Sequence, residues 1–158
     1  METKANNFKS LQILHGAFLA GMVLFSIVSV IINITGRLKG VDASLEKPLQ
    51  VIALLLTAGS AGMGFFIFNK RIQSVDNNAN AAERINIYRS IAIIRWAMIE
   101  APVLFIIISF MLTGNYAFLG LAVVLMGIFA STAPLKNKIV QQLQLNDNEV
   151  AQLEGQSE

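Results

Sequence analysis

The sequence predicts an all-α polytopic membrane protein, a four-transmembrane-helix bundle with its N and C termini in the cytoplasm. Of the 158 residues, 54% are hydrophobic and only 14% are charged, which is too apolar a balance for a small soluble domain. The apolar residues form four runs of about 20 residues, the length that an α-helix needs to cross about 30 Å of hydrocarbon. These runs are residues 11–34, 49–68, 90–112 and 116–134. They define a membrane domain over residues 1–134 and leave residues 135–158 as a cytoplasmic amphipathic tail.

The first run is expected to be a retained transmembrane helix and not a signal peptide. It is longer than the apolar segment of a typical signal peptide. It also leads into Asn33-Ile34-Thr35-Gly36-Arg37 without a cleavage site of small residues.

The second run is rich in small residues, which predict tight helix packing. Ala58 and Gly62 are four residues apart, as are Ser60 and Gly64, and Gly59 lies between them. Small side chains at this spacing let another helix approach closely in lipid, where no hydrophobic force drives helices together. We therefore expect Ala58, Gly59, Gly62 and Gly64 to lie at a helix–helix contact.

The loop between the second and third runs carries a helix start signal. Asn80 and Glu83 have the spacing of an N-cap, in which the asparagine side chain accepts a hydrogen bond from the glutamate amide. The third helix is therefore predicted to begin near Ala81, about two to three turns before the membrane. Residues 76–78 are the predicted turn, so the second and third helices form a hairpin that protrudes into the cytoplasm.

Glu100 is the only acidic residue within the four runs, and it lies close to the middle of the third. A charge at that depth costs at least about 2.5 kcal/mol, so such residues usually face a partner or a water pathway. If the second run goes inward as far as Asn69 and the third goes outward from Ser90, Glu100 lies level with Ser60. Desolvation would keep the carboxyl protonated at neutral pH and able to donate a hydrogen bond. We interpret Glu100 first as a structural residue that joins helices, and second as a carrier of a proton or ion.

Arg95 is the second charge within the third run. Its side chain is long enough to reach the headgroups, and this snorkelling conformation is the first expectation. The alternatives are that Arg95 faces His15, which lies at a similar depth on the first helix, or that it pairs with Glu100 of an adjacent subunit. His15 by itself is most simply a polar packing residue.

Two turn signals shape the end of the chain. Thr113-Gly114-Asn115 predicts a tight reversal, which makes the third and fourth helices neighbours. In the tail, the apolar residues at helical spacing among polar ones are Leu135, Ile139, Val140 and Leu143. Asn146 and Glu149 have the spacing of a further N-cap. We expect the tail to lie on the membrane surface or on its own bundle, and a partner-binding helix is the alternative.

The basic residues orient the bundle. The two tails and the second loop hold eight of them, whereas the first and third loops hold three. Because lysine and arginine are enriched on the cytoplasmic side, the larger group predicts that both termini lie inside. The larger group is Lys4, Lys9, Lys70, Arg71, Arg84, Arg89, Lys136 and Lys138, and the smaller is Arg37, Lys39 and Lys47.

Several function classes are excluded by what the sequence lacks. The chain has no cysteine and a single histidine, so disulfides, thiolate metal sites and most metal or catalytic-triad arrangements are ruled out. No second carboxylate lies within the runs, and no known catalytic or phosphate-binding motif is present. A net charge of +2 does not indicate nucleic-acid binding. We predict no enzymatic activity, no metal and no cofactor.

Residues 57–114 resemble the helical hairpin of the proteolipid c subunits of rotary ATPases. The matching features are the glycines of the second run, then Lys70 and Arg71, then Ala97-Met98-Ile99-Glu100-Ala101-Pro102. In that family the carboxylate binds the translocated proton or sodium ion, so the resemblance implies this role for Glu100. The chain departs from the family in its loop, where residues 76–80 replace an Arg-Gln-Pro sequence, and in its two additional runs.

Two functions follow from these features. The first is a non-enzymatic scaffold or subunit of a membrane complex, bound to another membrane protein or to further copies of itself. The alternative is a proton- or ion-handling proteolipid in which Glu100 is the protonatable site, with Ser60, Arg95 and His15 around it. Either function places the chain in the lipid bilayer as a multi-pass protein, and we expect a bacterial inner (plasma) membrane.

Overall fold

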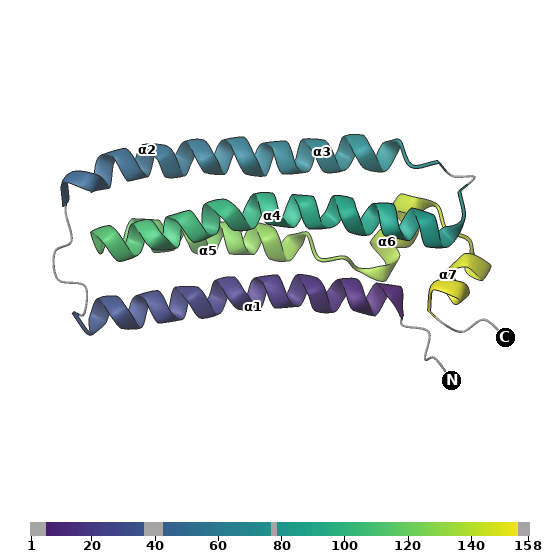
Figure 1. Ribbon diagram of the computed structural model, residues 1–158, viewed down its shortest axis with the longest axis horizontal. Helices are drawn as coiled ribbons and strands as arrows, with labels where there is room; N and C mark the ends of the chain where they lie inside the picture. The colour runs from purple at the N-terminus through teal and green to yellow at the C-terminus, as the bar shows by residue number, and fades with distance from the viewer. Residues whose placement is uncertain (1–5, 37–42, 77–78, 155–158) are drawn as a thin grey trace.

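The computed structural model describes residues 6–36, 43–76 and 79–154, and every regular element in these ranges is helical. The long helices lie side by side along one axis, and α1 begins at the same end of the bundle at which α7 lies (Figure 1). The elements are α1 (Asn7–Ile34), η1 (Ala43–Leu45), α2 (Glu46–Leu56), η2 (Thr57–Ala61), α3 (Gly62–Gln73), α4 (Ala81–Thr113), α5 (Tyr116–Ser131), α6 (Lys136–Leu143) and α7 (Asp147–Leu153).

Asparagine residues begin four of these helices. The side chains of Asn6, Asn80, Asn115 and Asn146 each accept a hydrogen bond from a backbone N–H of the first turn. This satisfies one of the N–H groups that a helix start leaves without a partner. The predicted start of a helix at Ala81 is confirmed.

The reversal between α4 and α5 is also confirmed. Gly114 ends α4 with φ of 68°, in the left-handed region that glycine adopts without strain. Asn115 follows directly as the N-cap of α5. The predicted turn at residues 76–78 lies partly outside the described residues, as do Arg37 and Lys39 of the first loop.

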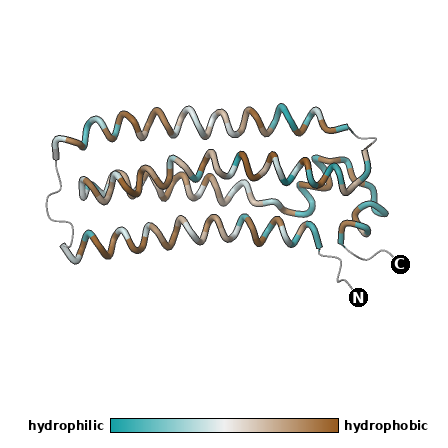
Figure 2. Tube along the Cα trace, viewed as in Figure 1, coloured by the Kyte–Doolittle hydropathy of each residue, from teal (hydrophilic) through white to brown (hydrophobic). Residues whose placement is uncertain are grey.

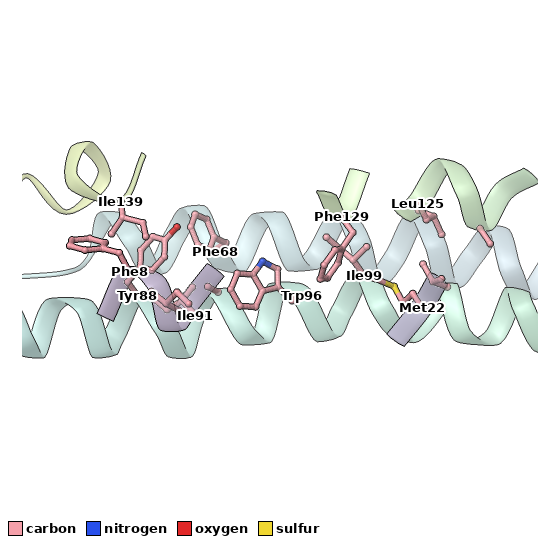
Figure 3. Close-up of a cluster of buried hydrophobic side chains, with 14 of the residues drawn as sticks. Phe8, Met22, Phe68, Tyr88, Ile91, Trp96, Ile99, Leu125, Phe129 and Ile139 are labelled. Carbon is pink, nitrogen blue, oxygen red and sulfur yellow. The ribbon is translucent and has the colours of Figure 1, made fainter. Parts of the chain in front are cut away.

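The central helix is α4, which packs against α1, α3 and α5. Half of its most apolar stretch (50%) is buried within the bundle, against 17% for α1 and 17% for the helix over Glu46–Gln73. Trp96 and Ile99 of α4 lie in the core among side chains from α1, α3 and α5 (Figure 3). A helix that is apolar on all faces is typical of a bundle core.

Three helices of the described chain are long and apolar enough to cross a membrane, or four if α5 and α6 together form one bent span. The predicted fourth run, residues 116–134, is helical only as far as Ser131, and α6 then departs at 62°. Pro134 explains the earlier end, because it has no N–H to continue the ladder and disfavours helical geometry in the residue before it.

The helix over Glu46–Gln73 contains a π-helical segment, η2, at its middle. It includes Ala58, Gly59 and Ser60, the small residues on which the packing prediction rests. The hydroxyl of Thr57, at its start, is buried without a hydrogen-bond partner in the described part of the chain.

The tail folds back onto the end of the bundle where the chain begins. Ile139 and Leu143 of α6 and Leu153 of α7 are buried, so the amphipathic pattern is confirmed within these helices. Leu135, which precedes α6, is exposed and does not follow the pattern. Asn146 and Glu149 form the predicted reciprocal N-cap of α7. Hydrophilic residues gather at this end of the molecule, whereas the long helices are mostly hydrophobic (Figure 2). Of the predicted locations for the tail, the structure favours its own bundle.

Candidate functional site

Three buried polar side chains meet where α5 ends, those of His15, Arg95 and Thr132. A helix terminus leaves up to four carbonyl groups without helical partners, and it carries the negative end of the helix dipole. Pro134 creates such a terminus inside the bundle. The side chains that meet it come from α1 and α4.

Arg95 of α4 binds this terminus. Its Nη2 donates a hydrogen bond to the Thr132 carbonyl oxygen at 3.2 Å, and its guanidinium carbon lies 3.7 Å from the centroid of the Phe68 ring. Arg95 is only 8% exposed. The prediction that it snorkels to the headgroups is therefore wrong, because the free carbonyls of α5 and an aromatic face offer the charge closer partners.

His15 of α1 binds the same terminus one turn earlier. Its Nε2 lies 3.1 Å from the Phe129 carbonyl oxygen, and a carbonyl only accepts, so Nε2 carries the proton. Its ring stacks on Phe129 at 4.5 Å and meets the edge of Trp96 at 5.0 Å. The structure thus brings His15 and Arg95 to one polar layer, where they bind carbonyl oxygens three residues apart on the chain.

This polar layer caps the end of α5, and the positive charge of Arg95 within it is only partly compensated. Gln12 of α1 adds a third hydrogen bond, from its Nε2 to the Pro134 carbonyl oxygen at 3.5 Å. No carboxylate in the described part of the chain forms an ion pair with Arg95. The described residues also contain no group of three or more metal-ligating side chains.

Glu100 lies apart from this layer and apart from Ser60. On α4, Met98 contacts Gly64 of α3, and Glu100 lies about 160° around the helix from Met98. Trp96, one turn before Glu100 on the same side, contacts α1. Glu100 therefore faces the α1 side, and the Ser60 hydroxyl instead donates to the Leu56 carbonyl of its own helix at 2.9 Å.

The predicted pairing of Glu100 with Ser60 is wrong. The two residues lie at the same depth in the bundle, but their side chains point in different directions. Contact of Gly64 with Arg95 and Met98 is the register that the antiparallel hairpin predicts. Register follows from span ends, whereas the direction in which a side chain points follows from the rotation of each helix. Glu100 is half-buried, and no described side chain makes a hydrogen bond or ion pair with it.

Of the four predicted packing residues, only Gly64 lies at a contact within the chain. A methyl group on Gly64 would lie 3.2 Å from Met98 Cβ and 3.5 Å from the Arg95 carbonyl oxygen. Ala58, Gly59 and Gly62 are exposed, and a methyl group on either glycine would meet nothing within 4 Å. These three residues therefore do not pack against a helix of the described chain, because α3 turns its Gly64 side to α4. Their packing against a helix of another molecule stays a prediction.

A cavity of 140 Å³ adjoins Arg95, and the sequence did not indicate it. Its lining comes from α3, α4, α6 and the break after α5: Phe65, Tyr88, Arg95, Ser131, Thr132, Ala133, Lys138 and Gln142. Lys138 and Gln142 are separated from Arg95 by about forty residues in sequence. The one available signal was Pro134, which marks a helix end within a transmembrane run.

A comparison of the chain with protein-family models, curated proteins and solved structures found no significant match. The resemblance of residues 57–114 to the c subunits of rotary ATPases therefore stays a prediction.

Proposed function

We propose that this chain is a non-enzymatic scaffold or subunit of a membrane complex. Its partner, another membrane protein or a second copy of the chain, binds the outer face of α4 around Glu100. In this proposal the bundle lies in a bacterial inner membrane with both termini in the cytoplasm. The end that carries the tail also carries Lys70, Arg71, Lys136 and Lys138, as a cytoplasmic end should.

The observation that carries the proposal is the environment of Glu100. A carboxyl group within a transmembrane helix needs a hydrogen-bond partner, because lipid offers none. Glu100 has none among the described residues, and it is half-buried at the edge of the bundle and not sealed in its core. A partner from outside the chain would satisfy it.

The residues beside Glu100 support a close approach. Ala97 and Ala101 lie within one turn of it on α4 and are both exposed. Alanine at such positions lets a second helix come near enough for van der Waals packing and an interhelical hydrogen bond, which together drive association in lipid. Larger apolar residues on the neighbouring turns, such as Ile94 and Ile108, would frame the contact.

Cysteine cross-linking tests this proposal, and the chain has no natural cysteine to interfere. Ala97→Cys and Ala101→Cys should give cross-linked products with a bismaleimide in native membranes. Leu55→Cys on α2 and Val124→Cys on α5 are matched controls, since both side chains are exposed and lie on other faces. Adding Glu100→Leu should reduce the product, whereas Glu100→Gln should preserve it, because the amide keeps hydrogen-bonding groups. Equal products at all four positions, or none on α4, would reject the interface.

A proton- or ion-handling role of Glu100 is the second candidate. One feature favours this role. The nearest cation on the same helix, Arg95, binds the Thr132 carbonyl oxygen and the Phe68 ring, so it provides no counter-charge for Glu100. Native mass spectrometry in mild detergent separates the two roles. A large homomeric ring supports ion handling, and a hetero-complex or small oligomer supports the scaffold.

A further inference from the structure

The cavity beside Arg95 has the composition of an anion site. Two of its lining residues, Arg95 and Lys138, are cationic, and none is acidic. Two further lining residues, Tyr88 and Gln142, carry a hydroxyl and an amide group that can donate hydrogen bonds to an anion. The hydroxyls of Ser131 and Thr132 already donate to the Ile128 and Phe129 carbonyl oxygens.

Arg95 is the reason to expect a ligand. It is 8% exposed, and its Nε is buried without a hydrogen-bond partner in the described part of the chain. Buried charges are normally paired with an opposite charge, because a lone one loses its hydration. The dipole of α5 and the Phe68 ring compensate the guanidinium only in part, since a helix end amounts to about half an elementary charge.

The cavity is also large enough and reachable. Its volume of 140 Å³ exceeds what a single water needs, which is on the order of 10–15 Å³ in this measure. Lys138 and Gln142 are exposed on α6, so they border its entrance from the polar end of the molecule. Arg95 lies five residues inside the predicted start of the third run, which is about 7.5 Å below the boundary between headgroups and hydrocarbon. The exposed entrance at Lys138 and Gln142 therefore lies nearer that boundary than Arg95 itself.

We infer that this cavity binds a phosphate group, held by the Arg95 guanidinium and the Lys138 ammonium. Arginine offers phosphate a planar fork of N–H donors, and lysine adds a point charge at the entrance. The group belongs either to an anionic phospholipid headgroup or to soluble phosphate. Basic pockets between transmembrane helices on the cytoplasmic side are typical sites for such headgroups.

The test uses the full chain in a phosphate-free maltoside detergent, with Trp96, the only tryptophan, as the fluorescent reporter of thermal unfolding. One arm titrates inorganic phosphate against sodium chloride of equal ionic strength. The other titrates phosphatidylglycerol against phosphatidylcholine. Binding to the folded state should raise Tm in a saturable manner. A rise with inorganic phosphate identifies a soluble anion, and a rise with phosphatidylglycerol alone identifies a lipid headgroup.

Variants at the exposed entrance locate the site without disturbing the buried arginine. Lys138→Gln should weaken binding about tenfold, the loss of one charged hydrogen bond. Gln142→Glu should weaken it further, because it places a negative charge at the entrance. Arg89→Gln is the matched control, since it removes an exposed positive charge from the same end but does not line the cavity. Absence of a saturable rise in both arms, or equal weakening by Arg89→Gln, would overturn the assignment.

Discussion

Arg84 of α4 and Glu149 of α7 form an ion pair that ties the C-terminal tail to the start of the central helix. Arg84 is only 3% exposed, and its Nη1 also donates to the Leu143 carbonyl oxygen, near the end of α6, at 2.9 Å. Glu149 completes the arrangement, since its other carboxylate oxygen accepts the Asn146 N–H at 2.9 Å. One arginine thus binds both tail helices to α4.

Glu149→Gln should loosen the tail from the bundle. The substitution leaves the buried Arg84 charge without a counter-ion and weakens the cap of α7, and we expect a cost of about 1–2 kcal/mol. Hydrogen exchange should then be faster at the α7 amides but not in α5, which makes no contact with Glu149. Unchanged exchange in α7 would mean that the apolar contacts of Leu153 hold the tail alone.

The tail should also detach in acid. The hydrogen bond from the Asn146 N–H, and then the Arg84 guanidinium, hold the pKa of Glu149 below its ordinary value of 4.5. Because the folded pKa is the lower one, ionised Glu149 contributes stability that is complete above pH 4.5 and lost as pH falls through the folded pKa. The anisotropy of a dye at Gln152→Cys should fall over that interval. In a Glu149→Gln background this transition should be absent.

Gly64→Leu should damage the fold, and Gly62→Leu should not. A leucine at Gly64 meets Met98 and the α4 backbone, and we expect overpacking to cost about 1–3 kcal/mol. Gly62 has open space around it, so leucine there should leave the thermal stability of the detergent-solubilised protein unchanged. Size-exclusion chromatography after a heating series measures both. Equal losses in the two variants would show that α3 is rotated differently against α4.

Glu100 should react with dicyclohexylcarbodiimide, which attacks protonated carboxyl groups. No cation among the described residues pairs with Glu100, so its neutral form should be present near pH 7. Labelling should fade as the medium becomes alkaline, and Glu100→Gln should abolish it. A reagent-accessible Glu100 that stays unlabelled from acidic to neutral pH would mean that a partner's cation keeps it ionised, which rejects the proton-carrier role.

The orientation in the membrane is testable with reporter fusions. Alkaline phosphatase fused after Ala43 should be active, because this end is predicted to be outside the cytoplasm. The same enzyme fused after Ser74 should be inactive. The reverse pattern would show that both termini lie outside the cytoplasm.

The caps show how far sequence alone carries. Asn80, Gly114 and Asn146 act on backbone groups within a few residues of themselves, so each was predictable from its neighbours. The lengths of the apolar runs were equally local, because a membrane of fixed thickness selects them. The sequence by itself therefore determined that the chain forms three to four apolar helices of membrane-spanning length, most of their ends and the level at which Gly64 meets α4.

The directions of the side chains were decided only by the tertiary structure. In a soluble helix the polar face marks the outside, but α4 is apolar almost all round, so hydropathy does not encode its rotation. Because of that rotation, the Glu100 side chain points away from Ser60 and the Arg95 side chain points into the bundle. The Arg95 side chain lies inside the bundle because α5 ends shortly before Pro134, far away in sequence. That helix end leaves carbonyl oxygens beside the guanidinium. Such a partner exists only after the helices have packed, which is why no local pattern foretold it.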